Sequence, residues 1–72
     1  MKEEAEVPTL TQRQLEILHS VARGLSNAEI ARQFGISMDG VKRHIMAICR
    51  KLGASNRSEA VAIALRRQLL KS

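Results

Sequence analysis

Hydrophobic residues recur at helical spacing in four successive segments of the chain. The first apolar stripe, with spacings of three and four residues, consists of Leu15, Leu18, Ala22 and Leu25. Such a spacing places its members on one face of an α-helix. Thr11 and Gln14 have the spacing of a capping box at its start, and Gly24 marks its end. We therefore expect the first helix to lie between Thr11 and Gly24.

A second and a third helix follow after very short connections. Ser26 and Glu29 repeat the capping-box spacing, and Gly35 ends the second segment. Its apolar stripe consists of Ile30, Ala31 and Phe34. Ser37 caps the third segment, which ends at Gly53. The apolar face of that segment recurs at helical spacing and consists of Val41, Ile45, Ile48 and Leu52.

The fourth segment is apolar on more than one side. It begins near Asn56, with Glu59 at the capping-box position, and we expect it to run to about Leu70. Residues 60–65 are all apolar, which exceeds what one core-facing stripe of about 100° uses. The residues expected to face the core are Ala60, Val61, Ala64 and Gln68. An outward strip then remains, with Val61 on its border: Ser58, Ala62, Leu65 and Leu69.

The predicted fold class is all-α, because no strand-like alternation or internal repeat interrupts these segments. A length of 72 residues suffices for one domain, and with Phe34 as the only aromatic residue its core must be aliphatic. Residues 1–9 hold three Glu and a Pro without apolar periodicity, and are expected to form a flexible leader or linker. Residues 10–72 are the predicted domain, a compact four-helix unit.

Basic residues gather in the second half of the chain. Residues 1–36 contain four Lys and Arg against five acidic residues, whereas residues 37–72 contain eight against two. The net charge of +5 therefore comes entirely from the second half. Such an asymmetry indicates a polyanionic partner.

Several other function classes lack the residues that they need. One cysteine and two distant histidines do not complete a zinc site, and we expect no metal, no cofactor and no small-molecule ligand. No nucleophile–base pair, carboxylate pair or glycine-rich phosphate loop indicates an enzyme. The longest apolar run is six residues, against about 20 for a membrane span, and no signal-peptide pattern opens the chain. We therefore expect no membrane contact and a cytoplasmic, nucleoid-associated location.

The second and third helices, with the short turn between them, have the layout of a helix-turn-helix. Ala31 is small where the two helices must approach closely, and Gly35 can supply the left-handed backbone of the turn. Ile36 and Val41 can fill the angle between the helices. This arrangement favours DNA binding, because many DNA-binding domains use it.

The third helix carries cations on the face away from its apolar stripe. Lys42 and Arg43 lie in its first two turns, where a recognition helix meets base edges in the major groove. Arg usually reads guanine through O6 and N7, and Met46 can contact a thymine methyl group. Arg50 and Lys51 extend the charge along the helix. The expected partner is therefore double-stranded DNA.

Four segments between Leu10 and Ala64 resemble the LuxR/NarL/FixJ-type, or GerE-like, helix-turn-helix domain of bacterial transcriptional regulators. They are LTQRQLEIL, GLSNAEIARQFGIS, VKRHIMAICRKLG and NRSEAVAIA. The resemblance implies a DNA-binding output domain of a response regulator or a similar protein, with the third helix in the major groove. It also implies that the fourth helix forms a homodimer contact, which we expect to be weak and reinforced by DNA.

The resemblance assigns roles to single positions. Base reading falls on Lys42, Arg43 and Met46. Phosphate contacts fall on Ser26, Asn27, Ser37 and Arg50, to which we add His44 and Lys51. The expected dimer interface consists of Ser58, Val61, Ala62, Leu65 and Leu69. Three residues depart from the family pattern, in which Glu, Thr and a polar residue are usual: Gln14, Gly40 and Ala47.

Two other functions stay open on the sequence. One is a protein-interaction adaptor that binds through the fourth helix, and the other is a sigma-factor-like promoter-binding domain. RNA polymerase is a further candidate partner of a transcriptional regulator. Arg57 is expected to buttress the turn before the fourth helix or to contact Glu59. Cys49 is expected to be a small buried hydrophobe rather than a redox sensor.

Overall fold

The structure is a computed structural model that describes residues 9–70. Four helices follow one another: α1 (Gln12–Ala22), α2 (Asn27–Phe34), α3 (Met38–Leu52) and α4 (Arg57–Arg66). Residues 9–70 contain no strand, so the all-α prediction is confirmed. The expected leader lies, apart from its last residue, outside the described residues.

Side-chain caps fix where each helix begins. The N-cap residues are those that the sequence predicts: Thr11, Ser26, Ser37 and Asn56. Each side-chain oxygen accepts the backbone N–H three residues later, which would otherwise have no partner. The capping box expected for α4 is wrong, however, because the Glu59 carboxylate accepts the N–H of Ser55 at 2.6 Å and not that of the N-cap residue.

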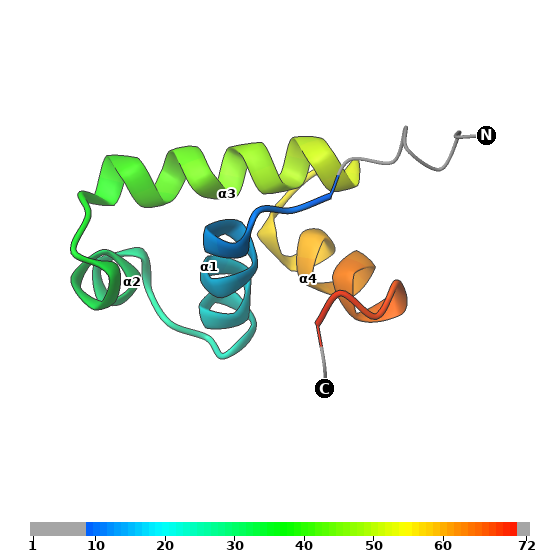
Figure 1. Cartoon of the computed structure of the whole chain (residues 1–72), viewed down its shortest axis with the longest axis horizontal. Helices are drawn as coiled ribbons and strands as arrows, with labels where there is room; N and C mark the ends of the chain where they lie inside the picture. The colour runs from blue at the N-terminus through cyan, green and yellow to red at the C-terminus, as the bar shows by residue number, and fades with distance from the viewer. Residues whose placement is uncertain (1–8, 71–72) are drawn as a thin grey trace.

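The helices form two layers (Figure 1). The long helix α3 extends along one side of the molecule, and α2, α1 and α4 lie next to one another beneath it. α1 occupies the centre and packs against the three other helices, whereas α2 and α4 do not pack on each other. One side of α3 is therefore covered along its length and the opposite side is not.

The core is aliphatic and is shared by all four helices. Its buried members are Ile17, Leu18, Val21, Ile30, Ala31, Val41, Ile48, Leu52, Ala60, Ile63, Ala64 and Leu70. On α3 the predicted stripe is correct, although Ile45 is only half-buried. On α1 the predicted stripe is rotated, because Ile17 and Val21 are buried with Leu18 whereas Ala22 is exposed. Gln14 also lies on the buried face of α1. Because it is polar, a pattern of apolar residues does not include it.

α4 ends earlier than the sequence predicts. It stops at Arg66, and Gln68 adopts a left-handed backbone with φ of 63°. The Leu69 N–H donates to the Ala64 carbonyl at 2.8 Å, which closes the helix end. Gln68 is exposed instead of facing the core, and the chain folds back so that Leu70 is buried. Ile63, which the sequence analysis left out, completes the buried face of the helix.

The turn between α2 and α3 has the expected construction. Gly35 has φ of 67°, a conformation that side-chain-bearing residues rarely adopt. Ala31 is buried where the helices meet, and its carbonyl accepts the Ile36 N–H at 3.0 Å. Val41 is completely buried beneath the turn. These contacts hold α2 and α3 in a helix-turn-helix arrangement.

Candidate nucleic-acid interface

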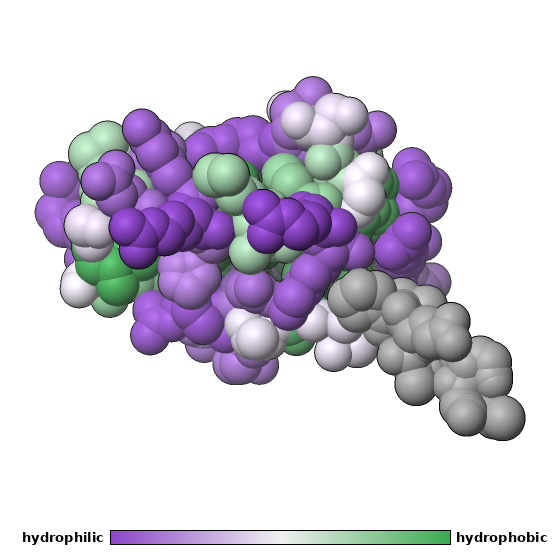
Figure 2. Space-filling view, turned by 90° about the horizontal axis from the view of Figure 1, so that it is seen from above, coloured by the Kyte–Doolittle hydropathy of each residue, from purple (hydrophilic) through white to green (hydrophobic). Residues whose placement is uncertain are grey.

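The uncovered side of α3 carries a line of exposed residues directly opposite its buried side. With about 100° between successive residues, the members of this line are Asp39, Arg43, Met46 and Arg50. All four are exposed, Met46 to 60%, and Lys42 is exposed beside them. Figure 2 shows the molecule from this side, where hydrophilic atoms surround small hydrophobic areas. We call these five residues the reading face.

The cations of the reading face have no acidic partner in the part of the chain that the structure describes. The ion pair found within residues 9–70 joins Arg13 and Glu16 of α1, at 3.9 Å. Lys42, Arg43 and Arg50 are therefore available to an anion from outside. Several exposed cations on one helix suit the neutralisation of DNA phosphates.

The N-termini of α2 and α3 differ in how many of their hydrogen-bonding groups are already used. At α2, the Ser26 N–H donates to Glu29 Oε1 at 2.7 Å. Hydrogen bonds from Ser26 lower the pKa of the Glu29 carboxyl, so a negative charge is held at this end. At α3, the Ser37 hydroxyl accepts the Gly40 N–H at 2.9 Å, but Gly40 has no side chain to complete a box. Each first turn thus contains one acidic residue, Glu29 in α2 and Asp39 in α3, but only the Glu29 carboxylate accepts the N–H of the N-cap residue.

Arg57 joins the start of α4 to the start of α2. Its Nη2 donates to Asn27 Oδ1, and both side chains are half-buried. Arg57 thus ties α4 to α2, and it does not form the alternative contact with Glu59. The bond uses only the acceptor oxygen of Asn27, so its side-chain NH2 group can still donate to a phosphate.

Lys51 differs from its neighbour Arg50 because its ammonium group is bonded within the chain. Nζ lies 2.9 Å from Gln14 Oε1 and 3.1 Å from the Thr9 carbonyl oxygen. Gln14 Oε1 also accepts the Thr11 N–H at 2.9 Å, so one oxygen serves both the cap of α1 and the end of α3. Two of the three ammonium N–H groups of Lys51 are thus bonded within the chain, which leaves Arg50 as the more available of the two cations.

His44 and Cys49 flank the reading face and are half-buried. Cys49 packs against the core and borders a hollow of about 460 Å³ between α3 and the start of α4. Burial raises the pKa of the Cys49 thiol, and the nearby Arg57 cation opposes this shift only in part. The thiol is therefore mostly protonated at neutral pH, as suits a packing role rather than a reactive one.

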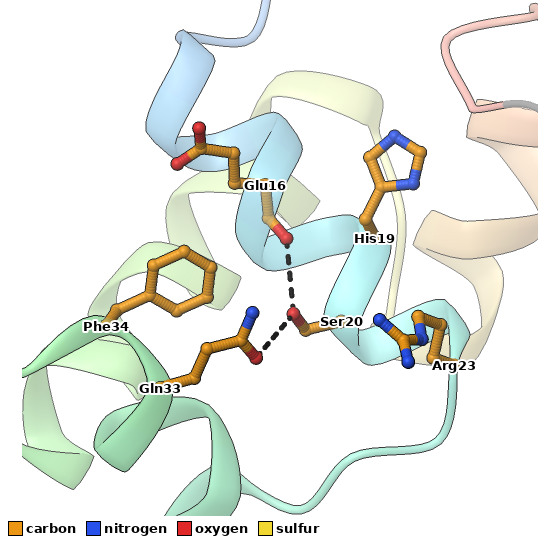
Figure 3. Close-up of a pocket in the computed structure, with 6 residues that line it drawn as sticks. All are labelled: Glu16, His19, Ser20, Arg23, Gln33 and Phe34. Atoms are coloured by element: carbon orange, nitrogen blue, oxygen red, sulfur yellow. Dashed lines mark hydrogen bonds between the residues drawn. The ribbon is translucent and has the colours of Figure 1, made fainter.

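A second hollow, of about 390 Å³, lies between α1 and α2 (Figure 3). Its lining comes from these two helices and the residue after α1: Glu16, His19, Ser20, Arg23, Gln33 and Phe34. The Ser20 hydroxyl lies 3.2 Å from Gln33 Oε1 and 3.4 Å from the Glu16 carbonyl oxygen, and its one proton can serve either. This hollow contains no residue of the reading face.

Residues 9–70 contain neither a group of metal-ligating side chains nor a membrane-spanning helix. No three His, Cys, Asp or Glu side chains are grouped so that they could hold a metal ion. No helix in the same range is both long and apolar enough to cross a membrane.

The outward strip expected on α4 is exposed, although its last member lies beyond the helix. Ser58, Ala62, Leu65 and Leu69 are exposed, the two leucines to 39% and 38%. Val61 is half-buried and packs against the core, as expected for a border residue. Leu69 follows the end of α4 instead of continuing it.

A helix-turn-helix with an exposed cationic second helix defines a DNA-binding domain. The comparison with known families gives the particular type. Residues 8–64 match the family of bacterial regulatory proteins described as the luxR family. This chain belongs to the luxR family.

Individual relatives agree with this assignment. The chain is 41% identical over 66 residues to the nitrate/nitrite response regulator protein NarP of Escherichia coli (strain K12). The matched segment covers 92% of this chain and 31% of NarP. The chain is 37% identical over 70 residues to the transcriptional regulatory protein YdfI of Bacillus subtilis (strain 168). Here the matched segment covers 97% of this chain and 33% of YdfI. The chain thus spans about a third of the length of these relatives.

Two solved structures have the same fold. The response regulator ChrA of a heme-sensing two-component system superposes with a TM-score of 0.83 and 38% identity, over 88% of this chain and 31% of ChrA. The transcription factor GerE superposes with a TM-score of 0.78 and 37% identity, over 85% of this chain and 92% of GerE. The family consists of DNA-binding transcription regulators and not of enzymes. This confirms the prediction of a DNA-binding regulator and the prediction that the domain is not an enzyme.

Proposed function

We propose that this chain is the output domain of a bacterial response regulator and binds a specific double-stranded DNA sequence in the cytoplasm. The observation that carries the proposal is the reading face, an exposed cationic line on a helix whose other side is buried. NarP and ChrA are response regulators about three times as long as this chain, as expected if it is one domain of such a protein. Contact with RNA polymerase stays a prediction.

In the proposed complex, α3 lies in the major groove with its N-terminal half toward the bases. Arg43 reads guanine, Lys42 reads guanine or a neighbouring acceptor, and Met46 contacts a thymine methyl group. Phosphate contacts come from Arg50 of the reading face and from four other residues: Ser26, Asn27, Ser37 and His44. Their amides, hydroxyls, imidazole and guanidinium all donate hydrogen bonds to phosphate oxygens.

Selection of bound duplexes from a random library at about physiological salt tests this function. Enrichment of one short motif supports sequence-specific binding, whereas salt-sensitive binding without enrichment would reduce the function to non-specific DNA binding. Arg43→Ala should lose about 1–3 kcal/mol on the selected site and relax its base preference. Arg50→Ala should weaken binding to all sequences alike. If Arg43→Ala loses as much affinity on random DNA as on the selected site, the assigned roles are wrong.

The outward strip of α4 is the proposed homodimer contact, formed by Ser58, Val61, Ala62, Leu65 and Leu69. Its two exposed leucines give little apolar area compared with the roughly 1,200–2,000 Å² buried in stable interfaces. We therefore propose a weak dimer that two adjacent half-sites, about 10 base pairs apart, reinforce.

Sedimentation at increasing concentration tests the dimer. Leu65→Ser should shift the protein toward the monomer, whereas Met46→Ser, at a more exposed apolar residue that lies on α3 and outside the proposed contact, should not. A wild-type protein that stays monomeric both alone and on a duplex with two half-sites would remove the dimer from the proposal.

A further inference from the structure

Asp39 is an acidic residue on the otherwise cationic reading face. It lies one turn before Arg43 on the same line of α3, and its side chain is exposed. No hydrogen bond or ion pair joins its carboxylate to another of residues 9–70, although Arg43 is four residues away. The carboxylate therefore points to solvent where the proposed complex places DNA.

A carboxylate at this position restricts what it can face. DNA phosphates repel it, so it does not add to general affinity. In the major groove, guanine and the O4 group of thymine present acceptors, which a carboxylate cannot bond. The donors there are the exocyclic amino groups of cytosine and adenine, and an acidic side chain is the usual partner of cytosine N4.

We propose that Asp39 determines part of the DNA sequence preference by accepting a hydrogen bond from the N4 amino group of a cytosine. This inference rests on the proposed function, in which α3 lies in the major groove. One helical turn separates Asp39 from Arg43, a rise of about 6 Å along α3, against about 3.4 Å between base pairs. The preferred site therefore contains a cytosine within about two base pairs of the guanine that Arg43 reads.

Asp39 also has a possible structural role, since an acidic residue in the first turn of a helix interacts favourably with the helix dipole. That role concerns the stability of α3 and is indifferent to the sequence of the DNA. Base preference therefore separates the two roles, and the experiment measures it directly.

The first experiment repeats the selection with Asp39→Ala, Asp39→Asn and the control Glu16→Gln, which removes an exposed acidic group from α1. We expect Asp39→Ala to lose the cytosine preference and to bind random DNA more tightly than the wild type. Asp39→Asn should shift the preference from cytosine toward adenine, because an amide pairs with adenine N6 and N7. Glu16→Gln should select the wild-type motif.

The second experiment deletes the contacted group from the DNA. The cytosine of the selected site is replaced by 2-pyrimidinone, which lacks the N4 amino group. The wild type should lose about 5- to 10-fold more affinity than Asp39→Ala does, at the lower end of what a good base contact contributes. Because both proteins meet the same weakened base pair, the difference isolates the hydrogen bond.

Two results overturn the inference: an unchanged motif for Asp39→Ala, or equal losses of both proteins on the 2-pyrimidinone duplex. Neither result touches the proposed function, which fails only if the wild type itself enriches no motif.

Discussion

Replacement of Lys51 by methionine should destabilise the domain without changing how its DNA affinity depends on salt. The Lys51 ammonium donates to the largely buried Gln14 side chain at 2.9 Å and to the exposed Thr9 carbonyl at 3.1 Å. A hydrogen bond to a charged group contributes about 1.5–3 kcal/mol, but water can replace Lys51 at Thr9. Methionine keeps an apolar stem of similar size, and Gln14 Oε1 keeps its bond from the Thr11 N–H. We therefore expect a loss of about 1–2 kcal/mol.

Arg50→Met is the matched control, since Arg50 is also a cation near the end of α3 but is exposed. Exposed substitutions of this kind usually change stability by no more than about 0.5 kcal/mol. If Arg50 contacts one phosphate, its loss makes the fall of log affinity with log salt shallower, by about 0.9 in the slope. Lys51→Met should thus change stability and not the salt dependence, whereas Arg50→Met should change the salt dependence and hardly the stability.

Thermal unfolding followed by circular dichroism and DNA affinity between about 50 and 200 mM salt give both quantities. A loss of 1 kcal/mol lowers the Tm of a domain of this size by about 4–8 °C, so Lys51→Met should melt at least about 4 °C below the wild type. If Lys51→Met instead keeps the wild-type Tm and lowers the salt slope as Arg50→Met does, the internal role of Lys51 is wrong.

Three further predictions follow from burial, capping and ionisation. Ile48→Ala removes a side chain that is 1% exposed and should cost about 2–5 kcal/mol in urea unfolding; a loss below about 1 kcal/mol would mean that the core of α3 is loosely packed. The pKa of Glu29 is lowered by its bonds from Ser26, so its stabilising effect should be present above the ordinary pKa and disappear as the pH falls through the lowered value. Unfolding measured from neutral to acid pH should show this dependence in the wild type and less of it in Glu29→Gln, and identical curves would refute it. Because burial raises the pKa of Cys49, a thiol reagent at neutral pH should modify the folded protein more slowly than the unfolded one, and an equal rate would show that the thiol is fully accessible.

The helix starts could be predicted because capping is local. Ser26 and Ser37 each bond to a backbone N–H three residues away, so both partners lie within one short stretch of sequence. The turn at Gly35 depends on that residue's own backbone conformation. The uncovered side of α3 followed from its regular apolar stripe, since the face opposite a buried stripe is exposed.

Contacts between distant residues could not be predicted in this way. Lys51 and Gln14 are 37 positions apart, and no local pattern indicates that one bonds the other. The sequence therefore counted Lys51 with Arg50 as a second exposed cation. Asp39 was counted in the charge balance but was not considered as part of the DNA-contacting face. Its spacing from Arg43 already indicates that both residues lie on one line of the helix.

The end of α4 separates the limit of a helix from the limit of a folding unit. The helix stops at Arg66 and the family match at residue 64, but the core continues to Leu70, which is 3% exposed. An expression fragment cut at either of the earlier positions would lack a buried leucine, whose burial contributes about 1.5–3 kcal/mol. For a domain this small, that is a substantial share of the stability available. A minimal recombinant version of this domain should therefore retain the chain through residue 70, past its last helix.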